Sequence, residues 1–256
     1  MIDPARFERV ERIDSTNSEL MRRPFGDRPA PACALATDRQ EGGRGRNGRP
    51  WLGDAQRSLA VSVAVERPVD GASMLGLPLA VGVAIADVLA AHGAAVRLKW
   101  PNDLHVDGPD GLAKVGGILV EARQQGALAR VVAGVGLNLA PSGALTAERV
   151  GQPAGALFAA DGAPPRERLE RALADAIADA MEGFPRGGLR PWLARWRALD
   201  ALDGAPVDLV RADGTRDPGV ARGVDDDGAL RVERTDGRIE RVLSGEVSVR
   251  RRGSAG

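Results

Sequence analysis

GGRGRNGR, residues 42–49, is the stretch that decides how the rest of this sequence is interpreted. Its glycines let the backbone approach a bound molecule closely, and Arg44, Arg46 and Arg49 offer planar donors that suit phosphate or carboxylate groups. Ordering eight such residues costs roughly 10 kcal/mol in backbone entropy, and three charge-assisted hydrogen bonds at about 1.5–3 kcal/mol each offset only part of that cost. We therefore expect a loop that is disordered when empty and that closes over a bound anion.

The main alternative for this loop is an RNA-binding tether rich in arginine and glycine. The formal net charge of the chain is zero at pH 7 and aromatic residues make up only 3% of it, so neither bulk attraction to nucleic acid nor aromatic stacking supports that alternative. No apolar run approaches the roughly 20 residues that span a bilayer, and the charged start, residues 1–11, is unlike a secretory signal. We expect a cytoplasmic protein, without a membrane segment, that binds its anion through a local cluster.

Outward from the loop, hydrophobic periodicity predicts a domain of mixed α and β structure. Strands are expected at residues 32–37, 58–66, 96–100, 104–106, 114–123 and 128–139, and helices at 14–21, 73–92, 166–183 and 189–199. Residues 140–162, rich in Gly, Ala and Pro, are expected to form a mobile loop. Beyond residue 203 short strands alternate with Asp-Gly turns, which predicts a small β-barrel. We place the boundary near Ala201, giving domains of residues 1–200 and 201–256.

Lysine is rare in this chain, because only Lys99 and Lys114 among 35 basic residues are lysines, and both lie inside motifs. The first lies in KWPND, residues 99–103, which brings a cation, an amide and a carboxylate to a strand end. That combination suits polar substrate groups or a metal-bound triphosphate, with a plain turn as the alternative. The second precedes a pair of glycines, 116 and 117, in a strand, which indicates that another group approaches the backbone closely, with a tightly packed sheet as the alternative. Compact ammonium groups at these two positions favour a bound carboxylate or phosphate.

In their order and spacing these motifs resemble the catalytic domain of the biotin protein ligases. The segments that carry the resemblance are Asp14-Ser15-Thr16-Asn17, Gln40, GRGRNGR at 43–49, KWPND at 99–103, KVGGIL at 114–119 and GVGLN at 134–138. The end of the chain, GEVSVR at 245–250, is similar to the closing β-domain motif of that family, so the resemblance covers about residues 7–250. It implies an α+β fold: a mixed β-sheet flanked by helices, like that of class II aminoacyl-tRNA synthetases, followed by a small SH3-like β-barrel.

The resemblance also implies a reaction in two steps. The biotin carboxylate first attacks the α-phosphate of Mg-ATP and gives biotinyl-5′-AMP and pyrophosphate. A lysine amine on a biotin carboxyl carrier domain of a biotin-dependent carboxylase then attacks this mixed anhydride. The substrates are therefore biotin and ATP, with Mg²⁺, and catalysis consists of positioning and charge stabilisation without a covalent enzyme intermediate.

Site residues follow from the same resemblance, position by position. The residues that it implies for biotin are Ser15, Thr16, Asn17, Gln40, Arg44, Gly45, Arg46, Lys114 and Gly116. Those implied for ATP or the adenylate are Arg46, Arg49, Trp51, Lys99, Asn102, Asp103, Lys114 and Asn138. Lys114, Arg44, Arg46 and Asp103 are the candidate catalytic residues, and Asp103 is also the candidate metal ligand. Glu246 and Arg250 are expected to reach the nucleotide from the small domain.

Three alternatives stay open at this point. A lipoate or octanoate protein ligase has the same fold and also acts on carrier-domain lysines, although its motifs differ from those quoted above. A biotin-sensing transcriptional regulator carries a winged helix-turn-helix before the Asp-Ser-Thr-Asn motif, but only 13 residues precede Asp14 here, so we expect no DNA binding. The RNA-binding module remains the third.

Overall fold

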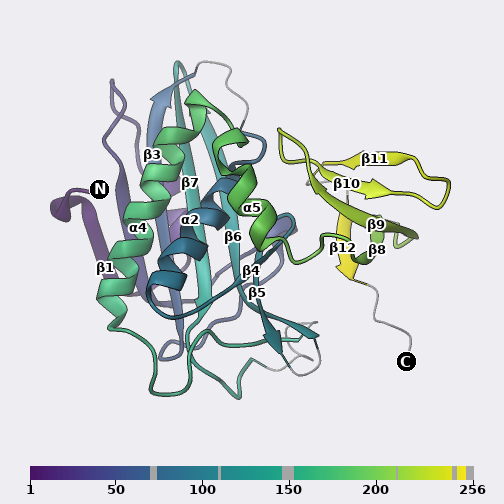
Figure 1. The fold of residues 1–256 in the computed structure, drawn as a ribbon. Helices are drawn as coiled ribbons and strands as arrows, with labels where there is room; N and C mark the ends of the chain where they lie inside the picture. Colours follow the sequence, from purple (N-terminus) through teal and green to yellow (C-terminus); the bar gives the residue numbers. More distant parts are fainter. Residues whose placement is uncertain (70–73, 109–110, 146–152, 212, 244–246, 252–256) are drawn as a thin grey trace.

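The architecture consists of two β-sheets joined in one chain (Figure 1). It is a computed structural model that describes residues 1–256 except 70–73, 109–110, 146–152, 212, 244–246 and 252–256. A seven-stranded mixed sheet with helices on it precedes a five-stranded antiparallel sheet, which confirms the predicted α+β class. No helix among the described residues is long and apolar enough to cross a membrane.

The large sheet has the strand order β1-β2-β3-β7-β6-β5-β4. Its strands are β1 (Phe7–Ile13), β2 (Cys33–Gln40), β3 (Ser58–Pro68), β4 (Arg97–Lys99), β5 (Asp103–Gly108), β6 (Gly111–Gln125) and β7 (Leu128–Asn138). Only the β1–β2 pair is parallel; the other neighbours are antiparallel. The sequence did not predict β1, because this edge strand, FERVERI, buries no residue fully and shows no alternation of apolar and polar residues.

Helices cover the sheet on both faces. Helices α2 (Leu77–Ala91) and α4 (Arg166–Gly183) pack on one face, where they share a core with Ala34, Val61 and Ala133. Helix α1 (Thr16–Arg22) packs on the other face, where Leu20 meets Leu35, Ala64 and Val132. Successive strand residues point to opposite faces, so the separation of these two residue sets places α1 on the face opposite α2 and α4.

Two predicted segments differ from the structure. Helix α2 starts at Leu77, since Pro78 suits a first helical turn, and the predicted first residue, Ser73, lies outside the described residues. The predicted helix 189–199 is a 3-10 turn (Arg190–Trp192) that continues into α5 (Leu193–Leu199), so Trp196 is fully buried while Trp192 is only partly covered.

The predicted mobile loop, residues 140–162, is partly tied to the sheet. Pro153 O accepts from Lys114 N at 2.8 Å, Gly155 N donates to Lys114 O at 2.9 Å, and Phe158 N donates to Leu139 O at 2.9 Å. Residues 146–152 lie outside the described part of the chain. The described remainder therefore pairs with the sheet next to Lys114, and the mobility predicted for the segment stays a prediction.

The small sheet has the order β11-β10-β9-β8-β12. Its strands are β8 (Pro206–Arg211), β9 (Arg216–Val224), β10 (Leu230–Glu233), β11 (Ile239–Val242) and β12 (Val247–Arg251). Gly214, Gly228 and Gly237 have positive φ angles at the three predicted Asp-Gly turns. The sheet is fastened to the large domain where Trp100 Nε1 donates to Gly228 O at 3.0 Å in a buried contact and Ala201 N donates to Leu98 O at 2.8 Å.

Candidate active site

A cavity of about 610 Å³ lies where the arginine loop, the ends of β4–β7, the start of α1 and strand β12 meet. The residues that line it include Ser15, Thr16, Asn17, Gln40, Arg44, Gly45, Arg46, Arg49, Trp51, Ser62, Lys99, Asn102, Asp103, Lys114, Gly117, Ile118, Leu119, Gly134, Gly136, Asn138 and Arg250. Segments that are more than 200 residues apart in sequence therefore contribute to one space.

The polar end of the cavity is built on the first turn of α1. Ser15 caps the helix by accepting from Ser18 N at 3.3 Å, which places Thr16 and Asn17 in the cavity wall although they are 2% and 4% exposed. Thr16 N donates to Gln40 Oε1 at 2.9 Å. Ser62 Oγ donates to Asn17 Oδ1 at 2.7 Å and lies 2.7 Å from Thr16 Oγ1. These contacts form a fixed, uncharged hydrogen-bonding surface.

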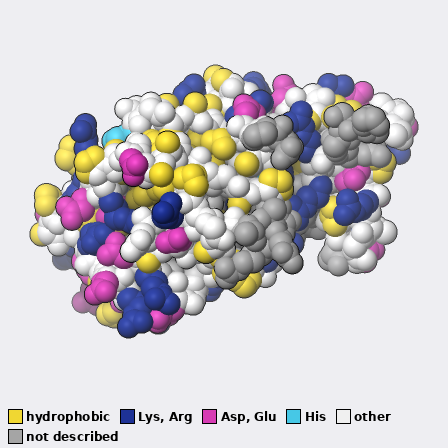
Figure 2. Space-filling view, turned by 90° about the horizontal axis from the view of Figure 1, so that it is seen from below, with side chains coloured by type: hydrophobic (Ala, Val, Ile, Leu, Met, Phe, Trp, Pro, Cys, Tyr) yellow, Lys and Arg dark blue, Asp and Glu magenta, His cyan; other side chains and the backbone are white. Residues whose placement is uncertain are grey.

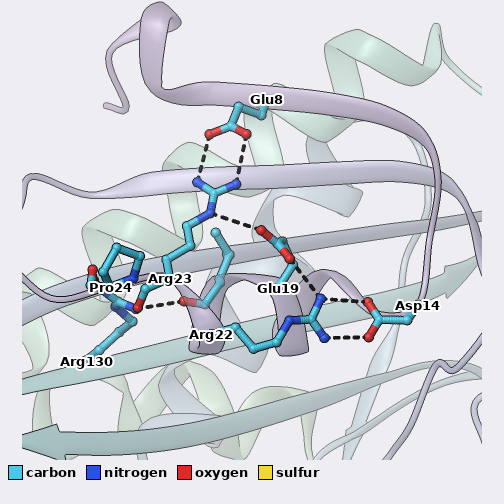
Figure 3. A network of polar contacts seen from close by, with 8 residues as sticks. Glu8, Asp14, Glu19, Arg22, Arg23, Pro24 and Arg130 are labelled. Atoms are coloured by element: carbon cyan, nitrogen blue, oxygen red, sulfur yellow. Dashed lines mark hydrogen bonds and ion pairs between the residues drawn. The ribbon is translucent and has the colours of Figure 1, made fainter.

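Ion pairs hold α1 against the sheet (Figure 3). Arg22 donates to both oxygens of Asp14, at 2.6 and 3.1 Å, and to Glu19 at 2.8 Å, and its guanidinium holds the pKa of the Asp14 carboxyl below the usual range. Arg23 donates to both oxygens of Glu8 on β1, at 2.7 and 2.8 Å. Since Asp14 precedes the capping Ser15, this network fixes the helix start that lines the cavity.

Two glycines of β7 make room for the cavity wall. A Cβ on Gly134 would lie 2.1 Å from Asn17 Oδ1, and a Cβ on Gly136 would lie 2.4 Å from Trp51 Cε2. Contacts this short require the neighbour to move, so only glycine permits the observed positions of Asn17 and Trp51. The GVGLN motif thus places one glycine under each end of the cavity.

The arginine loop folds back on itself between β2 and β3. Trp51 N donates to Gly43 O at 2.8 Å and Gly45 N donates to Arg49 O at 2.7 Å, with Asn47 and Gly48 at positive φ in the turn. Arg44 Nη2 lies 3.0 Å from Glu121 Oε1 on β6. Burial lowers the pKa of Arg46, although Asp103 opposes this shift. The disorder predicted for the empty loop stays a prediction.

At the other end of the cavity Lys114 and Asp103 form the central ion pair. Lys114 Nζ lies 2.6 Å from Asp103 Oδ1 and 5.7 Å from the centroid of the Trp51 ring. Burial alone would raise the pKa of Asp103, but the His105 imidazole and the Lys114 ammonium outweigh it and hold that pKa at about 2. Burial also lowers the pKa of Lys99.

The charge of the lining is strongly one-sided. Six described side chains in it are cationic, namely Arg44, Arg46, Arg49, Lys99, Lys114 and Arg250, and one, Asp103, is anionic. On the face of the molecule in Figure 2 both signs are interspersed, and the net charge of the whole chain is zero. The excess of positive charge is therefore local to the cavity, and the end around Lys114 and Asp103 suits a polyanion.

All but one of the described residues predicted for the site line the cavity. The exception is Gly116, where a Cβ would lie 2.6 Å from Leu137 Cδ2; this position faces the core, and the next residue, Gly117, lines the cavity in its place. Glu246 falls outside the described residues. Asn102 Nδ2 donates to Ile118 O at 2.7 Å, and Asn138 Oδ1 is buried without a hydrogen-bond partner in the described chain.

Two residues of the site were missed in the sequence. Ser62 interrupts the apolar strand SLAVSVAVE, and a polar residue in such a strand was the available signal. Glu121 lies two residues beyond the quoted motif KVGGIL and received no role; it accepts from Asn17 Nδ2 at 2.9 Å. Phe158, the one aromatic residue of 140–162, packs against the core, and we assign it no contact with a ligand.

Comparison with known proteins decides the family. The family model of the biotin/lipoate A/B protein ligases matches residues 10–138, and that of the biotin protein ligase C-terminal domain matches residues 204–250. The bifunctional ligase/repressor of Salmonella typhimurium is 36% identical over 93% of this chain and 72% of its own length. The chain belongs to the biotin protein ligases. The expected family and class of enzyme are thereby confirmed.

Two further relatives of this biotin protein ligase support the assignment. The biotin–[acetyl-CoA-carboxylase] ligase of Mycobacterium tuberculosis is 32% identical over 93% of this chain and 86% of its own length. The biotin protein ligase of Aquifex aeolicus, solved in complex with biotin and ATP, has a TM-score of 0.78 and 24% identity, and the match covers 96% of this chain and 99% of that one. The latter shows that the fold is shared.

Proposed function

We propose that this biotin protein ligase uses ATP to convert biotin to biotinyl-5′-AMP and then transfers biotin to a lysine of a biotin carboxyl carrier domain. The observation that carries the proposal is the two-part cavity. A fixed end built from the uncharged side chains of Thr16, Asn17 and Ser62, with Arg44 held beside it by Glu121, adjoins an end where the cavity's other five cations gather around one carboxylate, Asp103. A small polar head group and a triphosphate fit these two ends respectively, and the carboxylate of biotin would meet the α-phosphate between them.

We assign the uncharged end to biotin. The proposed contacts are Ser15, Thr16, Asn17 and Gln40, with Arg44, Gly45 and Arg46 of the loop above them. The head group of biotin is a cyclic urea, whose N–H and C=O groups match the hydroxyls and amides at this end. Lipoyl and octanoyl groups carry no such polar ring, so the same surface would leave polar groups unpaired against them.

We assign the cationic end to ATP and to the adenylate. In the first step an oxygen of the biotin carboxylate forms a bond to the α-phosphorus while the bond from that phosphorus to pyrophosphate breaks. Lys114, Arg46 and Arg49 would stabilise the charge on the phosphate oxygens, with Lys99 and Asn102 further along the nucleotide. Asn138 Oδ1, buried and free in the described chain, would accept from the adenylate.

In the second step the acceptor amine bonds to the acyl carbon, AMP leaves, and the amine loses a proton. Asp103 has a pKa of about 2 and is paired with Lys114 at 2.6 Å, so it is a weak base. Its proposed role is to hold Lys114 in place. The proposed catalytic residues are Lys114, Arg44 and Arg46, which would stabilise charge, and Asp103, which would hold Lys114 in place.

Magnesium would arrive with ATP and neutralise part of the triphosphate charge. The described residues contain no group of three or more His, Cys, Asp or Glu able to hold a metal ion, and Asp103 is the one carboxylate among the described lining residues. Mg²⁺ is commonly held by one or two carboxylates together with substrate phosphates and water. Asp103 would be its single protein ligand.

Pyrophosphate release with biotin, lipoate and octanoate, measured side by side with ATP and Mg²⁺, tests the proposal. We expect pyrophosphate release with biotin to be at least about 100-fold faster than with either fatty acid. A fatty acid would leave two or more polar groups of the site unpaired, at a cost of about 1–3 kcal/mol each. If pyrophosphate release were faster with lipoate or octanoate than with biotin, that acid and not biotin would be the substrate. No release with any acid would reject the adenylation step.

A further inference from the structure

Glu121 joins two parts of the site although it is not among the residues that line the cavity. Its two oxygens lie 3.0 and 3.1 Å from Arg44 Nη2 in the arginine loop. Its Oε2 also accepts from Asn17 Nδ2 at 2.9 Å, in the first turn of α1. One side chain of β6 thus contacts both the loop and the polar end.

Glu121, at the shorter distance, and Leu119 O together fix which way the Asn17 amide points. A carboxylate accepts hydrogen bonds and cannot donate them, and Leu119 O, 3.2 Å from Asn17 Nδ2, is also an acceptor. The NH₂ group of Asn17 must therefore face these two acceptors. Its Oδ1 then faces Ser62, whose single hydroxyl proton it accepts at 2.7 Å.

That orientation sets the direction of the next hydrogen bond. Because the Ser62 proton is committed to Asn17, the 2.7 Å contact between the Ser62 and Thr16 hydroxyls requires Thr16 to donate. Thr16 Oγ1 also donates to Gln40 Oε1 at 3.1 Å, so its single proton is shared between two acceptors inside the protein. Both hydroxyls donate their protons to partners inside the protein, so only their lone pairs face the cavity.

Gly134 shows that the wall is shaped around this arrangement. A Cβ there would lie 2.1 Å from Asn17 Oδ1 and 2.8 Å from Ser62 Oγ, so the strand leaves space only for this close pair. The pair is nearly dry, since Asn17 is 4% and Ser62 0% exposed. In such an environment an opposed pair of acceptors is strongly unfavourable, and the direction of the chain is maintained.

We infer that Glu121 is a positioning residue that makes the site selective for a ligand whose polar end donates N–H groups. It does so by setting the donor direction from Thr16 through Ser62 to Asn17, and it holds the loop over the ligand through Arg44. The inference rests on the proposed function, in which this end binds the cyclic urea of biotin. A ligand without an N–H at that position would oppose its own lone pairs to those of Thr16 and Ser62.

The test compares unmutated protein with Glu121→Leu and Glu121→Gln. The matched control is Glu233→Leu, which removes another strand glutamate from an ion pair, with Arg222 at 2.6 Å, in the small domain. Calorimetry without ATP measures the Kd of biotin and of its cyclic carbamate analogue, in which oxygen replaces one ureido N–H. Biotin-dependent pyrophosphate release measures the KM of ATP, and thermal melts report the fold.

We expect unmutated protein to prefer biotin over the carbamate by at least about tenfold, since one unpaired polar group costs about 1–3 kcal/mol. In Glu121→Leu the preference should fall at least threefold and the biotin Kd should rise about tenfold, with the KM of ATP changed less than twofold. Glu121→Gln keeps an acceptor for Asn17 and should retain the preference. Glu233→Leu should leave all three values unchanged.

An unchanged preference in Glu121→Leu would overturn the inference, and so would a lower melting temperature with unaltered constants, which a purely structural role predicts. If Glu121→Leu does not fold, a Glu121→Gln variant that loses the preference would overturn it equally. The proposed function fails separately, when unmutated protein binds biotin but releases no pyrophosphate. Failure of unmutated protein to bind biotin would remove both.

Discussion

The two ends of the cavity recognise their ligands by different physical means. At the uncharged end Thr16, Asn17 and Ser62 are almost fully buried, and each is held by hydrogen bonds inside the protein. At the cationic end the charges come from a loop, from strand ends and from β12, and the Lys114 side chain is 16% exposed. Fixed dry hydrogen bonds give selectivity, whereas gathered charges give attraction to any polyanion. We expect substitutions at the two ends to change different constants.

The largest expected effect is the loss of Lys114. In Lys114→Ala the rate of biotinyl-adenylate formation should fall about 100- to 1,000-fold, the range for removing one preorganised charge stabiliser. The biotin Kd should rise less than tenfold, because the uncharged end stays intact. Rapid-quench kinetics measure the rate of adenylate formation, and calorimetry measures the Kd of biotin. A variant that formed adenylate at the unmutated rate would show that Lys114 has been assigned the wrong role.

The Asp103→Asn variant tests the cationic end through the pH dependence of the free energy of unfolding. The folded-state pKa of Asp103 is about 2, below the ordinary 3.8, so its ionised form stabilises the fold above pH 4. That contribution, roughly 2 kcal/mol, is lost as the pH falls from about 4 to 2. Unmutated protein should therefore exceed the variant in unfolding free energy at pH 6 and match it near pH 2.

The control for this experiment is Asp107→Asn, at the exposed end of the same strand. Denaturant unfolding of all three proteins between pH 2 and 7 gives the free energy of unfolding of each as a function of pH. A constant difference between unmutated protein and Asp103→Asn across this range would show that ionisation of Asp103 does not stabilise the fold.

The two glycines of β7 offer the sharpest contrast between the ends. Gly134→Ala pushes against Asn17 and Gly136→Ala against Trp51, which lies beside Lys114. We expect Gly134→Ala to raise the KM of biotin about tenfold and Gly136→Ala to raise the KM of ATP about tenfold, each with less than a threefold change in the other constant. Equal changes of both constants in both variants would mean that the cavity behaves as a single unit.

The smallest expected effect is that biotin protects the arginine loop from cleavage by trypsin. If the loop is ordered by its ligand, biotin at saturating concentration should slow tryptic cleavage within residues 44–49 several-fold, because cleavage requires local opening. Cleavage elsewhere in the chain is the internal control. Equal rates with and without biotin would remove the predicted disorder-to-order transition and leave the loop as a static wall.

Sequence reasoning found most of this site because its chemistry sits in short motifs. Glycine pairs, lone lysines and an arginine loop are local signals, and the central strands β3, β6 and β7 show their apolar pattern plainly. Edge strand β1 was missed because its charged residues pair with other parts of the chain, as Glu8 does with Arg23. Periodicity describes burial, and an edge strand with few buried residues gives no periodic signal.

The residues that were missed act through tertiary contacts. Glu121 contacts Asn17, 104 positions earlier in the chain, and Ser62 contacts Asn17 across 45 positions. Gly116 and Gly117 look alike in the sequence, yet the strand turns one to the core and the other to the cavity. Which of two neighbours faces a ligand depends on the strand register, and a motif alone does not fix it.

The most direct test of the central claim is to identify the product that the protein makes from biotin and Mg-ATP. Mass spectrometry of the acid-quenched mixture, with Lys114→Ala alongside, detects biotinyl-5′-AMP and relates its amount to the protein. We predict about one equivalent of biotinyl-5′-AMP bound to each unmutated chain before any carrier domain is added, and at least a 100-fold slower approach to that level in Lys114→Ala. Pyrophosphate release without the acyl adenylate would contradict the joining of biotin and ATP in this cavity.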